Sequence, residues 1–159
     1  MNKPCNGRSA LPRAAYGGDL HAWAREQAAL LRAGRLSEAD AANIAEELDD
    51  VGNEQYDKLE SALRVLFAHM LKWDHQPERR GRSWALTIRT QRRHVLKVLR
   101  KNPSLKASLG EALGEAYADA RDEAAKEIDL PLRTFPVDLP YAWDAILDRP
   151  FELDPPDEV

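Results

Sequence analysis

Apolar residues recur every three or four positions along most of this chain, and this spacing constrains the fold more than any other feature. The clearest example is the run of Tyr56, Leu59, Leu63, Leu66, Phe67 and Met70. No run of alternating apolar and polar residues indicates a β-strand. The sequence therefore predicts an all-α fold, a helical bundle of about five main helices plus a short C-terminal helix.

Capping residues indicate where the first two helices begin. Asp19 is a favourable N-cap, and Gly34 is a stop signal, so the first helix is expected between them. Ser37 is expected to start the second helix, because Asp40 follows it three positions later in a variant of the capping box.

Glycine, serine and proline separate the next helices. Gly52 marks a break, after which a third helix is expected over residues 53–73. Ser83 can cap a fourth helix, which is expected to end near Lys101. Pro103 then opens a fifth helix, since proline is well tolerated in a first turn.

Alanines on the fifth helix predict that a neighbouring helix approaches it closely. That helix is expected to carry Leu105, Leu109, Leu113 (or Ala112), Ala116, Tyr117, Ala120 and Ala124. Prolines interrupt the chain after Leu130, and one short helix is expected after Pro140. It would bury Trp143, Ile146 and Leu147.

The length of 159 residues is typical of one domain. We expect a flexible N-terminal lead-in over residues 1–18, a single all-α domain over 19–148 and an acidic, frayed tail over 149–159. The one cysteine, Cys5, allows no intramolecular disulfide. The apolar runs are too short to span a membrane and no secretory signal is evident, so we expect a cytoplasmic protein with no membrane partner.

Charge is divided between acidic and basic segments. Residues 38–60 contain nine acids and one base, Lys58, whereas residues 79–101 contain nine bases and no acid. One face of the fourth helix is expected to carry Arg82, Arg89, Arg93, Lys97 and Arg100. This stripe is a candidate nucleic-acid interface. The favoured alternative is a solvated face that complements acidic helices, because the net charge is −4.

The sequence contains few motifs of established chemistry. It has no Glu-x-x-His pair, no phosphate-binding glycine loop and no Gly-x-Ser-x-Gly. We therefore predict no metal site and no cofactor. A small-ligand or catalytic site remains an alternative if Glu47, His69, Gln91 and Arg92 converge on an open pocket. Gln91 lies on the apolar seam of its helix and is expected to be buried with hydrogen-bond partners.

The segment between the third and fourth helices is expected to form a rigid structural corner. Lys72 complements the negative end of the third helix. Trp73 and Trp84 bracket the turn, and Pro77 restricts the loop. Two antiparallel helices joined in this way would explain the aromatic and basic residues without a catalytic role.

Two spaced motifs around this corner resemble a known bacterial family. They read His69-x-Leu71-Lys72-Trp73-x-x-Gln76-Pro77 and Ser83-Trp84-x-x-Thr87-Ile88-x-x-Gln91-Arg92. Further landmarks agree from Tyr16 to Asp148, including Ala45-Glu46-Glu47-Leu48 and Pro140-Tyr141. The chain resembles the family called "domain of unknown function 29".

The resemblance implies an all-helical bacterial protein and no particular activity. It implies candidate site residues, namely Glu47, His69, Lys72, Trp73, Gln76, Ser83, Trp84, Thr87, Gln91 and Arg92. The family often has a cysteine before its late Pro-Tyr, whereas this chain has Leu139, which places any thiol-dependent mechanism in doubt. The leading hypothesis is a non-catalytic, cytoplasmic helical interaction module that binds an unknown protein partner or itself.

Overall fold

A computed structural model describes residues 14–152, and all regular structure in that range is helical. This confirms the all-α prediction. The helices are α1 (Leu20–Arg32), α2 (Ala41–His75), α3 (Arg82–Lys101), α4 (Leu109–Ile128) and the short α5 (Trp143–Asp148), joined partly by 3₁₀ turns. The chain forms two compact units, one up to Val51 and one from Gly52 onward. None of the helices in the described range is both long enough and apolar enough to cross a membrane.

The first helix begins and ends where its capping residues predict. Asp19 accepts a hydrogen bond from the Ala22 amide at 2.9 Å, which satisfies one free donor of the first turn. Gly34, just beyond the C-cap of α1, has a φ of +71°. That conformation favours glycine, so Gly34 is a backbone requirement.

The predicted break at Gly52 is wrong, because α2 is one helix of 35 residues. Gly52 is exposed and has open space where a Cβ would be. A helical glycine costs about 1 kcal/mol relative to alanine, which a long helix packed over much of its length can absorb. The prediction of Ser37 as the helix start is also wrong. Ser37 lies in a 3₁₀ turn, and Asp40 accepts the Asn43 amide at 3.3 Å instead.

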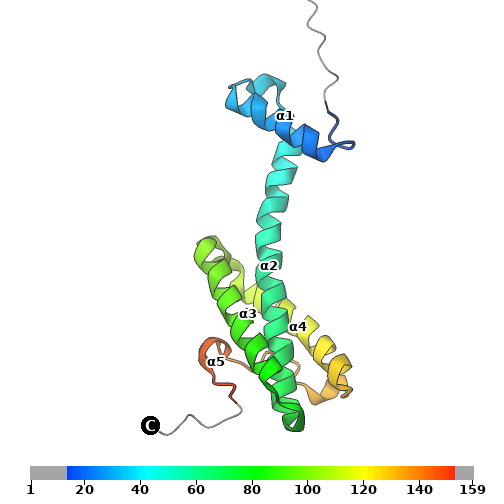
Figure 1. The fold of residues 1–159 in the computed structure, drawn as a ribbon, viewed down its shortest axis with the longest axis vertical. Helices are drawn as coiled ribbons and strands as arrows, with labels where there is room; N and C mark the ends of the chain where they lie inside the picture. Colours follow the sequence, from blue (N-terminus) through cyan, green and yellow to red (C-terminus); the bar gives the residue numbers. More distant parts are fainter. Residues whose placement is uncertain (1–13, 153–159) are drawn as a thin grey trace, which may run out of the picture. The chain divides into compact units, whose positions relative to one another are not determined.

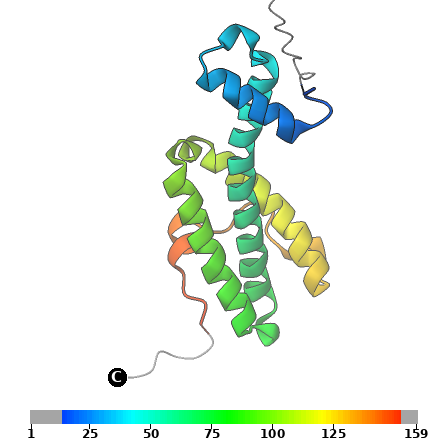
Figure 2. The same cartoon turned by 45° about the horizontal axis from the view of Figure 1, so that its top comes forward.

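In the unit from Gly52 onward, the second part of α2 lies between α3 and α4 (Figures 1 and 2). It supplies most of the core, including the fully buried Leu59, Leu63, Leu66, Phe67, Met70 and Leu71. On α3, Ile88 and Val95 face this core. The helical stripes read from the sequence therefore identify the core faces.

Helix α4 contributes the alanine stripe predicted for close packing. Ala112, Ala116, Ala120 and Ala124 have no exposed surface. The start of this helix differs from the prediction, because residues Pro103–Ser108 form a 3₁₀ helix before α4 begins at Leu109. Ser83 also does not cap α3, whose N-cap is Gly81.

The C-terminal segment packs more tightly than its proline-rich sequence predicts. In α5, Ile146 is fully buried as expected. Phe151 is only 7% exposed, although it lies in the predicted frayed tail. The predictions for residues 1–13 and 153–159 lie outside the described residues.

Candidate functional site

Lys72 and His69 form the centre of a polar cluster near the C-terminal end of α2. Lys72 is 4% exposed and pairs with Glu127 of α4. Its Nζ lies 3.3 Å from His69 Nε2 and 5.3 Å from the centroid of the Trp84 ring on α3. One buried ammonium thus links three helices through an ion pair, a hydrogen bond and a cation–π contact.

The tautomer of His69 follows from its partners. Its Nδ1 lies 2.9 Å from the Val65 carbonyl, which can only accept, so Nδ1 carries the proton. Nε2 is then free to accept from Lys72. Burial lowers the pKa of His69, and the hydrogen bond to Val65 only partly offsets this. His69 is therefore a neutral member of an internal network at neutral pH.

Arg92 is bound to the backbone of α5. Its Nε donates to the Ile146 carbonyl at 2.7 Å, and its Nη2 donates to the Ala145 carbonyl at 3.0 Å. The guanidinium also lies 5.1 Å from the Phe151 ring centroid. Burial lowers the pKa of Arg92. The Ala145 carbonyl also accepts the Arg149 amide at 3.2 Å, but the residue four positions after Ile146 is Pro150, which has no N–H. Arg92 therefore supplies the donor that the helix itself cannot give to the Ile146 carbonyl.

Trp73 is part of the corner between α2 and α3. Its ring packs edge-to-face on Phe151, with centroids 5.5 Å apart. Arg80 donates to the Trp73 carbonyl at 2.7 Å and lies over its ring. These contacts agree with a rigid corner, and they add the C-terminal segment to it.

The other family residues make fewer contacts. Thr87 donates to the Ser83 carbonyl at 2.9 Å, one turn earlier in α3. Gln76 is half-buried, and its Oε1 has no hydrogen-bond partner among the described residues. Gln91 is half-buried rather than buried.

His69 and Arg92 have different partners: His69 contacts Val65 and Lys72, whereas Arg92 contacts α5. Arg92 borders a surface hollow of about 490 Å³, together with Arg89, Asp148 and Phe151. His69 is not among the residues that line this hollow. Glu47 belongs to the other compact unit. In the described part of the chain, no group of three or more His, Cys, Asp or Glu residues could hold a metal ion.

A second polar network is centred on Asp74, and no motif in the sequence predicts it. Tyr141 donates to Asp74 at 2.9 Å, and Arg149 donates through Nη1 at the same distance. Burial alone would raise the pKa of Asp74, but the hydrogen bonds from Arg149 and Tyr141 outweigh it and hold the pKa below its usual range. Tyr141 stands in the Pro-Tyr landmark, but its partner is 67 residues away.

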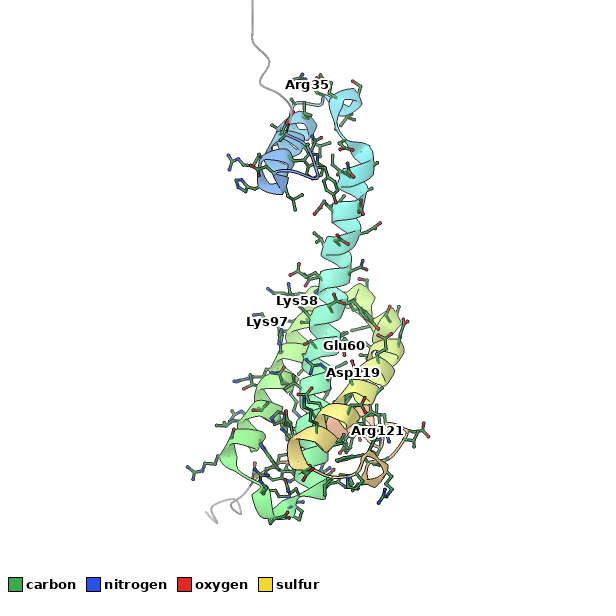
Figure 3. The ribbon with its side chains drawn as sticks, turned by 90° about the vertical axis from the view of Figure 1, so that its right-hand side faces the viewer. Arg35, Lys58, Glu60, Lys97, Asp119 and Arg121 are labelled. Atoms are coloured by element: carbon green, nitrogen blue, oxygen red, sulfur yellow. The ribbon has the colours of Figure 1, made fainter. Side chains whose placement is uncertain are left out.

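Acidic side chains gather between α2 and α4. Tyr56 donates to Glu115 at 2.6 Å, and Glu60 and Asp119 lie nearby on the two helices (Figure 3). Burial raises the pKa of Glu60, as does the charge of Asp119, against the opposing effect of Arg64. The adjoining ion pair of Arg64 with Glu123 shows how the same two helices neutralise part of this charge.

The basic stripe on α3 is exposed. Arg82, Arg89, Arg93, Lys97 and Arg100 all lie at the surface, with Lys97 labelled in Figure 3. Within residues 14–152, no acidic side chain forms an ion pair with any of the last four. Leu86 and Leu96 are exposed on the same face. The four stripe bases from Arg89 to Arg100 therefore have no ion-pair partner among the described residues.

The unit up to Val51 has an apolar groove between α1 and the start of α2. Trp23, Leu31, Ile44, Leu48 and Val51 are among its lining residues. Leu31 is 43% exposed, Leu48 66% and Val51 56%.

Polar contacts hold the two walls of this groove together. Gln27 of α1 accepts a hydrogen bond from the Asp40 amide at 2.8 Å. Tyr16 packs edge-to-face on Trp23 and bonds to Glu47, which raises the Tyr16 pKa to about 12. Glu47 therefore lines the groove and helps to hold Tyr16 in place beside Trp23.

In the described residues, these features define an all-helical protein with internal polar networks, an exposed apolar groove and an exposed basic stripe. The family described as "Domain of unknown function DUF29" matches residues 15–152, and the chain belongs to this family. No curated protein and no solved structure matches the chain significantly.

Proposed function

We propose that this protein is a helical interaction module that binds an amphipathic helix of a protein partner. The observation that carries this proposal is the exposed apolar groove formed by α1 and the start of α2. Large apolar side chains left exposed together mark interaction surfaces more often than isolated ones do.

The groove has the form of a helix-binding site. Two helices alone cannot enclose their apolar faces, so a third helix laid between them would bury Leu31, Leu48 and Val51. The recognised feature would be a row of apolar anchors at helical spacing.

The negative charge around the groove indicates what kind of partner helix would bind. In residues 14–51 acidic side chains outnumber basic ones, and Glu46, Asp49 and Asp50 lie beside the groove residues in sequence. A partner helix with Lys or Arg flanking its apolar anchors would be attracted, and an acidic one repelled.

The family residues around the corner support a structural role. The polar atoms of Lys72, His69 and Arg92 form hydrogen bonds with partners inside the protein. We therefore propose that these residues hold helices α2 to α5 in register. We favour this role over the alternative, an enzyme or small-ligand site around His69 and Arg92. We also propose that residues 19–148 act as one functional domain in the cytoplasm.

Nucleic-acid binding is the second candidate function. The exposure of all five bases of the α3 stripe favours it. The net charge of −4 and the acidic surfaces elsewhere oppose it. A gel shift at low salt with single- and double-stranded probes tests it, and absence of retention would eliminate this candidate.

The leading proposal is tested by photo-crosslinking in cells. A benzophenone side chain at Leu48 should give a discrete adduct, whereas one at Ala118, exposed on α4, should not. The partner identified in the adduct, once purified, should bind the wild-type protein. It should bind the variant L31E/V51E with an affinity at least about tenfold lower. No adduct at Leu48 above the Ala118 background, or unchanged binding by L31E/V51E, would refute the proposal.

A further inference from the structure

The groove in the unit up to Val51 continues into a wider apolar strip on α1 and the start of α2. On α1, Leu20 and Leu31 are 48% and 43% exposed, and they share one side of the helix with Ala24 at 100° per residue. On α2, Leu48 and Val51 are exposed on the side that borders the groove. The strip therefore contains exposed apolar side chains from both helices.

Basic side chains form the outer edge of this strip on α1. Arg25 and Arg32 are seven residues apart, which is about two helical turns, so they lie on the same side of α1, and both are exposed. With Ala24 and Ala28 they line a shallow hollow. The same two alanines also line the groove, so the basic edge directly adjoins it. The one acid of α1, Glu26, projects to another side of the helix.

Acidic side chains form the outer edge of the strip on α2. Residues 41–51 contain four acids and no base. Of these acids, Glu46 and Asp49 are exposed and follow Leu48 around the helix, on the side away from α1. The apolar strip thus has a basic edge on one side and an acidic edge on the other.

An apolar strip with opposite charges on its two edges is complementary to itself. When two copies meet face to face about a two-fold axis that runs along the groove, the α1 edge of each copy lies over the α2 edge of the other. Arg25 and Arg32 of each copy then face acids of the other, and the apolar side chains of both copies meet between the edges. This is the isologous arrangement usual in dimers. Every residue in this contact belongs to one compact unit.

We propose that the groove binds α1 and the start of α2 from a second copy of the chain, so that the two pairs of helices form a four-helix bundle. This inference rests on the proposed function and names the partner of the same groove. The partner helix expected there carries bases beside apolar anchors, and α1 has Arg32 beside Leu31. Four-helix bundles enclose such open apolar faces in one core.

Both edges of the strip favour a second copy over an unrelated basic helix. A helix that carries bases alone would face Glu46 and Asp49 but would offer no counter-charge to Arg25 and Arg32. A second copy supplies both signs at once. Charge complementarity of this kind fixes the orientation of the partner and disfavours the dimer in which like edges meet.

Sedimentation velocity of the full chain over a concentration series tests the proposal, and the wild type should dimerise. R25E/R32E makes both edges acidic and E46K/D49K makes both edges basic, so in each variant the dissociation constant of the dimer should rise at least about tenfold. An equimolar mixture of the two variants should recover a dimer as tight as the wild type, because every acidic edge then faces a basic one.

The control is K126E/R133E, which reverses two exposed bases outside this unit and should dimerise like the wild type. Circular dichroism establishes that each variant is folded. A wild type that stays monomeric throughout the series would overturn the proposal. So would a dimer that both charge-reversed variants retain, or a mixture that does not recover the dimer.

Failure of this inference is distinguishable from failure of the proposed function. A benzophenone side chain at Leu48 of the purified protein should give an adduct of twice the chain mass. If the wild type is monomeric and Leu48 forms its adduct in cells with a different protein, self-association is refuted and the groove keeps its proposed function. If Leu48 forms no adduct with any protein, the proposed function fails, and this inference fails with it.

Discussion

Arg92 of α3 donates a hydrogen bond to the Ile146 carbonyl of α5 across 54 residues of sequence, at 2.7 Å. The same guanidinium bonds to Ala145 and covers Phe151. A single side chain thereby ties the short α5 and the C-terminal segment to the helical core.

Replacing Arg92 by alanine should destabilise the protein by about 2 kcal/mol, because two carbonyls lose a charged donor. Urea unfolding at neutral pH measures the change. Arg93→Ala is the matched control, since Arg93 is exposed on the adjacent position, and it should change stability by less than about 0.5 kcal/mol. Equal effects of the two substitutions would contradict the assigned role of Arg92.

Replacing Ala116 by leucine should destabilise the protein by about 1–3 kcal/mol, because a fully buried alanine leaves no room for a larger side chain. Ala118→Leu lies on the exposed side of the same helix and should have little effect. Thermal unfolding compares the two. If Ala116→Leu left the stability unchanged, α4 would not pack closely on the core.

His69 should make stability depend on pH. Its folded pKa is lowered mainly by burial, so below about pH 6.5, the usual value for histidine, the unfolded chain takes up a proton more readily than the native protein does. Stability should therefore fall as pH falls through this value towards the lower folded pKa. In His69→Asn this dependence should be flatter, whereas in His21→Asn, an exposed control, it should match the wild type. Urea unfolding between about pH 5 and 8 measures it. Parallel curves for His69→Asn and the wild type would contradict the assignment.

Replacing Gly52 by alanine should stabilise the protein by about 0.5–1 kcal/mol, because α2 continues through this position and a Cβ meets open space. Gly34→Ala should instead destabilise it, since φ is +71° there. Chemical denaturation of both variants distinguishes them. A destabilised Gly52→Ala would mean that the helix is interrupted at Gly52, as its sequence alone indicates.

The helices were predictable where burial follows periodicity. Leu59, Leu63 and Phe67 repeat on one face over several turns, and all three are fully buried. The ends of helices were less predictable, as Ser37 and Ser83 show. A serine is a capping residue only if the chain is extended there, and neighbouring Asp40 and Gly81 occupy the junctions instead.

The candidate site was predictable in its members but not in its arrangement. Lys72 and His69 are three residues apart on one helix, so their contact follows from helical geometry. Glu127 and Trp84, which complete the cluster, come from other helices and carry no local signal of their role.

The sequence by itself determined the helical class, the core faces and the separation of acidic from basic segments, because each depends on residue type and local spacing. Only the tertiary structure decided that Arg92 binds α5, that Phe151 is buried and that the α3 stripe stays exposed. These outcomes depend on which distant segments pack together, and packing energy is summed over the whole core instead of along one helix.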